Sequence, residues 1–88
     1  MSKLVLSQAR VQVLNETSKA INEGFRLCLQ WCRYIYGNGS VETGYRFIWR
    51  KPNGHLQPAR GQARIPSLAV MSLLMKRAIR QGWGEMVG

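Results

Sequence analysis

The side chains with the clearest chemical potential form an alternating pattern in the second half of the chain, Arg60-Gly61-Gln62-Ala63-Arg64. Successive side chains of a β-strand point to opposite faces, so Arg60, Gln62 and Arg64 are expected to share one face. Arginine and glutamine contact phosphate groups and also form paired hydrogen bonds with the edges of guanine and adenine. The pattern therefore predicts a strand surface that binds nucleic acid.

The distribution of charge supports the same chemistry. The chain has 88 residues with 13 Lys and Arg, 4 Glu and no Asp, which gives a net charge of +9. Residues 43–84 contain eight basic residues and no acidic residue. These cations have no partner of opposite charge within their own segment, and they repel one another unless solvent, salt or a polyanion neutralises them. We therefore expect a surface that binds a polyanion.

Nine side chains are the candidate nucleic-acid-binding residues. They are Arg46, Arg50, Lys51, Arg60, Gln62 and Arg64 on or beside predicted strands, and Lys76, Arg77 and Arg80 in the last turns of a predicted helix. The helix residues are auxiliary, because cations near a helix C-terminus also interact favourably with the helix dipole. Arginine binds carboxylates as well as phosphates, so an adaptor or regulator that docks on an acidic protein is the alternative function.

The sequence lacks the residue sets that catalysis and metal binding require. Its four glutamates are scattered, and they form no carboxylate pair, glycine-rich phosphate loop or Ser/His/Asp set. The single histidine, His55, follows a predicted turn, and two cysteines with one histidine cannot supply the four ligands of a structural zinc site. We therefore expect a protein that is not an enzyme and that needs no metal or other cofactor.

The N-terminal half predicts a scaffold built on a long helix from about Asn15 to Tyr36. Asn15 suits the N-cap position, and polar side chains recur at helical spacing in one narrow stripe. The members of this stripe are Lys19, Glu23, Arg26, Gln30 and Arg33. Most other positions are apolar on two sides of the helix, which is more than one small sheet covers. We therefore expect a homodimer.

A second feature of this predicted helix is a series of small side chains four residues apart. Its members are Ala20, Gly24, Cys28 and Cys32. On a helix they would form a ridge that another backbone approaches closely. The two cysteines are then small buried apolar residues rather than a redox or metal pair, because free cysteine is among the most buried residue types.

Residues 1–14 allow two interpretations. Ala9, Val11 and Val13 alternate with Arg10 and Gln12, which favours a short strand near residues 9–14. Ser7 suits the N-cap of a longer helix continuous with the next segment. The strand is the preferred interpretation.

The C-terminal half predicts a small antiparallel sheet of about three strands. From Gly44 to Arg50 aromatic and basic side chains alternate, and the residues 51–54 (Lys-Pro-Asn-Gly) are typical of a turn. A returning segment completes a hairpin over residues 44–57, and residues 59–65 supply a further strand. Tyr45, Phe47 and Trp49 then face the core, although the same aromatic row also resembles a base-stacking platform for single strands.

A helix over residues 67–81 ends the predicted fold. Ser67 suits its N-cap and Gly82 suits a left-handed C-cap. The sequence thus predicts one α+β domain over residues 1–88, with a mainly helical scaffold in residues 1–42 and a basic hairpin, strand and helix in residues 43–84. No apolar run is long enough to span a membrane and no signal-peptide pattern begins the chain, so we expect a cytoplasmic protein.

Overall fold

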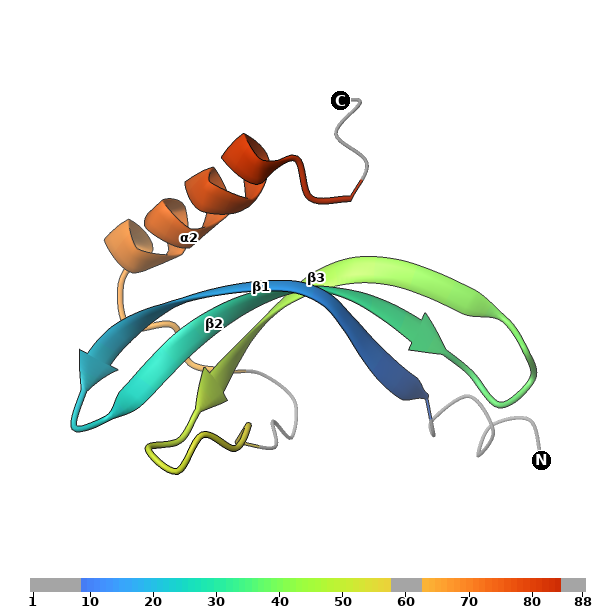
Figure 1. The fold of residues 1–88 in the computed structure, drawn as a ribbon, viewed down its shortest axis with the longest axis horizontal. Coiled ribbons are helices and arrows are strands. Elements are labelled where there is room, and N and C mark those ends of the chain that lie inside the picture. Colours follow the sequence, from blue (N-terminus) through green and yellow to red (C-terminus); the bar gives the residue numbers. More distant parts are fainter. Residues whose placement is uncertain (1–8, 58–62, 85–88) are drawn as a thin grey trace.

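The computed structural model describes residues 9–57 and 63–84 (Figure 1). Three strands, β1 (Arg10–Asn22), β2 (Phe25–Ile35) and β3 (Val41–Arg50), precede one helix, α2 (Leu68–Gln81). The strands form an antiparallel sheet in the order β1-β2-β3, so β1 and β3 are its edges. No helix in the described part of the chain is long and apolar enough to cross a membrane. The described residues therefore form a small domain of one sheet and one helix.

The long helix predicted from about Asn15 to Tyr36 is wrong, and so is the helical scaffold assigned to residues 1–42. The segment contains most of β1, a tight turn and all of β2. Asn22 pairs with Phe25, which leaves Glu23 and Gly24 as a two-residue turn with positive φ angles of 50° and 87°. Two left-handed residues match the twist of a β-hairpin. The turn was missed because glutamate rarely occupies the first of these positions.

The burial of both faces of β2 explains the error further. The side of β2 that faces α2 carries Leu27 and Leu29, and the opposite side carries Cys28, Gln30 and Cys32; all five are buried. A strand buried on both sides reads as a nearly continuous apolar run without alternation. On a helix, the same residues would form two apolar sides. The expectation of a homodimer rested on that second apolar side.

The predicted ridge of small side chains is also wrong, because it requires a helix. Cys28 and Cys32 are free and fully buried, as expected, but they lie on one strand. Four residues of strand separate them by about 13 Å, so no direct bond between the two sulfurs forms in this arrangement. The two thiols line one face of the sheet.

The preferred interpretation of residues 9–14 is confirmed and extended. The strand begins at Arg10 and continues to Asn22, so that the predicted short strand is the first part of the 13-residue β1. The pairing of β1 with β2 shifts between Val13 and Asn15. Leu14 is therefore an unpaired residue of a β-bulge.

The sheet is bent into an arch, and α2 lies on the outer side of this arch (Figure 1). Cys32 pairs with Val13 on one side and with Gly44 on the other, so the bulge at Leu14 and the glycine in β3 lie close to one row across the sheet. A bulge bends its strand, and glycine permits a tight bend. The inner side of the arch is the face that carries Cys28, Gln30 and Cys32.

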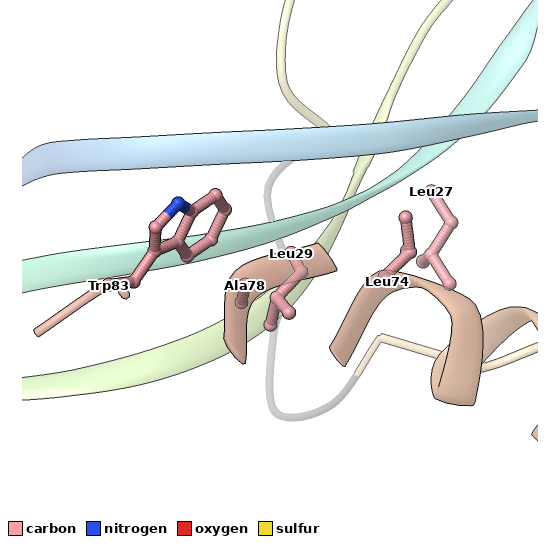
Figure 2. Close-up of a cluster of buried hydrophobic side chains, with 5 residues drawn as sticks. All are labelled: Leu27, Leu29, Leu74, Ala78 and Trp83. Carbon is pink, nitrogen blue, oxygen red and sulfur yellow. The ribbon is translucent and has the colours of Figure 1, made fainter. Parts of the chain in front are cut away.

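The predicted C-terminal helix is confirmed. Ser67 is its N-cap and accepts a hydrogen bond from the Val70 amide through its side chain, and Gly82 ends the helix with a φ of 72°. Leu74 and Ala78 of the helix pack on Leu27 and Leu29 of β2, and Trp83 closes one end of this core (Figure 2). The helix covers β1 and β2 but leaves the outer side of β3 less covered.

The predicted sheet has the correct number of strands and the correct antiparallel direction. The strands that pair with β3 in it were wrongly assigned. β3 pairs along its length with β2, whereas the predicted returning segment forms only one bridge, between Arg50 and Leu56. The predicted strand at 59–65 falls partly outside the described residues, and its described part, 63–65, is not a strand. The longer, more apolar β2 instead pairs with every residue of β3.

The contact between Gly24 and Pro52 joins the β1–β2 turn to the turn after β3. A Cβ atom on Gly24 would lie 2.9 Å from Pro52 Cβ, whereas a Cβ on Gly39, with a similar φ of 91°, would meet nothing within 4 Å. Both alanine variants pay about 1–2 kcal/mol for the left-handed backbone. We expect Gly24→Ala to lower the free energy of unfolding by at least about 1 kcal/mol more than Gly39→Ala, because overpacking adds to the backbone cost. Urea unfolding of both variants measures the difference, and equal losses would contradict the contact.

Candidate nucleic-acid interface

Basic side chains gather on the inner face of the sheet, opposite α2. Arg26 comes from β2, and Arg46 and Arg50 come from β3. Strand alternation and the pairing of Arg46 with Gln30 and of Arg50 with Arg26 place all three on the face that carries Gln30. We call these three residues the arginine cluster.

Gln30 connects the three strands on this face through its side-chain hydrogen bonds. Its side chain is fully buried, its Nε2 donates a 2.7 Å hydrogen bond to Glu16 Oε1, and its Oε1 accepts a 2.8 Å bond from Arg46 Nε. A buried amide that loses such partners costs about 1–3 kcal/mol, so this geometry is strongly favoured. The bond to Gln30 uses the Nε–H of Arg46, one of the five N–H donors of its guanidinium group.

Glu16 joins the network to a second arginine. Its Oε1 accepts from Arg50 Nη2 at 2.7 Å, in an ion pair whose side chains are 27% and 30% exposed for Glu16 and Arg50. Arg50 Nη1 also donates to the Gly54 carbonyl at 2.6 Å. The guanidinium of Arg50 is thereby held between β1 and the turn that follows β3.

The pKa of the Glu16 carboxyl reflects these bonds. Burial by itself raises this pKa, but the hydrogen bonds from Gln30 and Arg50 and the positive charge of Arg50 outweigh burial, so that the pKa lies below its ordinary value. Glu16 is therefore an anion at neutral pH and neutralises one charge of the arginine cluster.

Arg26 and Arg50 lie directly opposite each other on neighbouring strands. Like charges in this position destabilise a sheet. Arg26 Nε donates to Ser18 Oγ at 2.8 Å, and Arg26 itself is exposed. Glu16 pairs with Arg50 but has no recorded contact with Arg26, so the pair of guanidinium groups retains an excess of positive charge at one end of the inner face.

The charge analysis needs one correction. Residues 43–84 contain no acidic residue, but Arg50 has an acidic partner from outside that segment, Glu16, 34 residues earlier in the chain. Pairing of β1, β2 and β3 side by side brings the two together. Counting charges within a segment therefore overestimated the number of unpaired cations.

The predicted site residues do not form one surface. Arg46 and Arg50 lie on the inner face, and Lys51 directly follows β3. Arg64 is exposed, and its carbonyl accepts a 2.9 Å hydrogen bond from Trp49 Nε1. Arg60 and Gln62 lie outside the described residues, and Arg64 is not part of a strand, so the predicted Arg60-x-Gln62-x-Arg64 strand face does not extend to Arg64.

The three predicted helix residues lie on the other side of the sheet. Lys76 and Arg80 are exposed on α2. Arg77 is half-buried and its Nη1 donates to Thr17 Oγ1 at 3.2 Å and to the Ser18 carbonyl at 2.9 Å. Arg77 therefore fastens the helix to β1, and none of the three lies beside the arginine cluster.

Sequence reasoning missed Arg26, Gln30 and Glu16. All three were assigned to the predicted helix, where Arg26 and Gln30 were members of a solvated polar stripe. Read as a strand, residues 26, 28, 30 and 32 alternate with residues 25, 27, 29 and 31, which are all hydrophobic. Arg26 and Gln30 are the two polar residues in this apolar run, and their even spacing places them on one face of a strand.

The aromatic row of β3 lies on the opposite side, toward α2. Phe47 and Trp49 are half-buried against the core, which confirms the preferred interpretation for these two. Tyr45 is 49% exposed; its ring centroid lies 4.6 Å from that of Trp31, and its hydroxyl donates to the Trp83 carbonyl. This row supports the packing of α2 and is separated by the sheet from the arginine cluster.

The ion pair predicts a specific dependence of stability on pH. Because the pKa of Glu16 is lower in the folded protein, its contribution is present above its ordinary pKa of about 4.5 and is lost as pH falls through the folded value. We expect Glu16→Gln to lower the free energy of unfolding by about 1 kcal/mol near neutral pH and by progressively less as the pH falls below 4.5. Urea unfolding across this range measures the two curves.

Glu23→Gln is the matched control, because it removes one negative charge from the exposed β1–β2 turn of the same basic protein. A constant difference between the wild-type protein and Glu16→Gln at all pH values would contradict the role of the charged carboxylate.

The arrangement was compared with known proteins. Searches against protein-family models, curated proteins and solved structures found no match for this chain. The arginine cluster, with the buried amide of Gln30 that holds Arg46, is the candidate functional feature of the described residues.

Proposed function

We propose that this protein binds nucleic acid without catalysis, through phosphate contacts made by the arginine cluster. The observation that carries the proposal is the opposed pair Arg26 and Arg50, of which only Arg50 has a carboxylate partner among the described residues. A phosphate between the two guanidinium groups would replace their repulsion with charge-assisted hydrogen bonds. Arginine suits this role because its planar fork matches the geometry of phosphate oxygens.

The hydrogen bonds of the cluster favour binding further. Arg46 and Arg50 are held by Gln30 and Glu16, so less conformational entropy is lost when they contact a ligand. Arg26 is exposed, and within the described part of the chain its one hydrogen bond runs from Nε to Ser18 Oγ. The net charge of +9 adds a long-range attraction for any polyanion and increases the rate of encounter.

Comparison of Arg26→Ala with Arg80→Ala tests the proposal. Both variants lose one exposed arginine, but Arg26 belongs to the cluster and Arg80 lies on α2, on the other side of the sheet. We expect Arg26→Ala to weaken binding several-fold and to reduce the log–log salt slope by roughly 0.7–0.9, the value of one phosphate contact. Arg80→Ala should leave the slope nearly unchanged.

The measurement is fluorescence anisotropy of labelled DNA and RNA at several salt concentrations. Equal losses in both variants would mean that the net charge, rather than the cluster, attracts the polymer. No binding by the wild-type protein near physiological salt would retire the proposal in favour of the alternative, docking on an acidic protein.

A second candidate function, self-association, is favoured by an apolar groove between α2 and β3. The groove has a volume of about 410 Å³ and is lined by Leu29, Tyr45, Phe47, Met75, Ala78 and Ile79. Ile79 is 61% exposed, and exposed apolar surface of this kind marks interaction sites. We propose that a second copy of the chain covers it, as in the expected homodimer.

The groove is lined by uncharged residues, and this favours a second copy of the chain over an acidic segment as its occupant. An acidic segment would find no cation among the lining residues, whereas α2 itself offers an uncharged flank that includes Met75 and Ile79. By helical geometry, Lys76 lies at the rim of this flank, beside Ile79, and Arg80 lies further round the helix. Two identical flanks related by a two-fold axis contact each other without bringing these cations together at the centre.

Sedimentation velocity of two matched variants tests this candidate. Ile79→Glu places a charge on the groove flank, and Leu73→Glu places one on the other flank of α2, where Leu73 is 36% exposed. We expect a dimer for the wild-type protein and for Leu73→Glu, and a monomer for Ile79→Glu. A monomeric wild-type protein at high concentration would exclude self-association through the groove.

A further inference from the structure

We infer that the inner face selects single-stranded over duplex nucleic acid, with bases on Tyr34 and Tyr36 and phosphates on the arginine cluster. The inference rests on the proposed function and adds the class of polymer. It follows from the chemistry at the two ends of the inner face. The tyrosines lie at one end and the arginine cluster lies at the other.

The first observation is the position of the two tyrosines. Tyr34 lies on β2 four residues after Gln30, and strand alternation places it on the same face. Tyr36 N donates to the Ser40 carbonyl at 2.9 Å, which continues the antiparallel pairing beyond β2 and keeps Tyr36 in phase with Tyr34. Both residues are half-buried, so part of each side chain is accessible. The inner face therefore has an aromatic end as well as an arginine end.

The second observation is the carboxylate at the aromatic end. Glu42 pairs with Tyr34 across the strands and accepts a 3.0 Å hydrogen bond from the Tyr36 hydroxyl. An exposed carboxylate repels phosphate, so this end disfavours the backbone of a nucleic acid and leaves the tyrosines to the uncharged bases. The arginine end has the opposite preference.

The spacing of the two ends suits a short stretch of a single strand. Gln30 and Arg46 occupy one row of the sheet, and Tyr34 lies four residues further along β2, about 13 Å away. The bases of a single strand are free to stack on aromatic side chains while its phosphates lie in a basic groove. The inner face supplies both within one arch three strands wide.

Duplex DNA meets this face less well. Its bases are paired inside the helix, and reading them requires a helix or a two-stranded ribbon that enters the major groove. The arginine cluster lies on strands β2 and β3 within the sheet rather than on a protruding element. A duplex laid along the face would also bring phosphates to Glu42, which costs binding energy that a single strand avoids.

The experiment compares labelled oligo-dT, oligo-U and a mixed-sequence DNA duplex of equal length in anisotropy titrations at matched salt. We expect the wild-type protein to bind a single strand at least about tenfold more tightly than the duplex. Tyr36→Leu should weaken single-strand binding roughly 5- to 100-fold, because one stacked base is lost, and should change duplex binding little. Tyr36→Phe keeps the ring and removes only the hydroxyl bond to Glu42, so it should bind like the wild-type protein.

The outcomes separate this inference from the proposed function. Duplex binding as tight as single-strand binding, with the loss still specific to Arg26→Ala, would overturn the inference and leave the proposed function standing. Preference for single strands that survives both Tyr34→Leu and Tyr36→Leu would overturn the role of the tyrosines. No binding to any of the three probes would overturn both. The oligo-dT and oligo-U arms distinguish DNA from RNA.

Discussion

Gln30 lies at the centre of the sheet without exposure to solvent, and an amide in that position must be hydrogen-bonded at both its oxygen and its nitrogen. Glu16 and Arg46 meet this requirement from the two neighbouring strands. The amide thus fixes an acid on β1 and a base on β3 relative to β2, and the acid in turn fixes Arg50. The orientation of two of the three arginines follows from the burial of one uncharged side chain.

The two faces of the sheet have different roles: one packs against α2, and the other carries the candidate interface. The outer face is apolar and holds α2 through Leu27, Leu29 and Trp83. The inner face has a buried centre of Cys28, Gln30 and Cys32 and carries the arginine cluster. The central strand β2 is buried on both faces. It therefore carries residues of the hydrophobic core on one side and residues of the candidate interface on the other. A change in β2 that improves the contact with α2 also affects the arginines on the other side.

Local signals in the sequence predicted the C-terminal helix and the facing of β3 correctly. Ser67 and Gly82 are caps with a direct mechanism, and Tyr45, Phe47 and Trp49 alternate with Arg46 and Arg50 as a strand requires. The candidate site was predicted only in part, because its other members lie on strands that were taken for a helix. Arg46 and Arg50 have a local pattern, but the contacts of Gln30 with Glu16 and Arg46 span 14 and 16 residues and depend on the register of the sheet. The register of paired strands cannot be predicted from a short segment, because it depends on residues that are distant in the sequence.

The bulge at Leu14, described above as one origin of the arch, also affects how the protein behaves in crowded solution. β1 is 13 residues long and forms an edge of the sheet, and a long regular edge is a template for strands of other chains. The bulge breaks the regular spacing of backbone donors and acceptors along this edge, and exposed Arg10 and Lys19 add charges to it. The irregularity that shapes the inner face thereby also protects the protein against edge-to-edge aggregation.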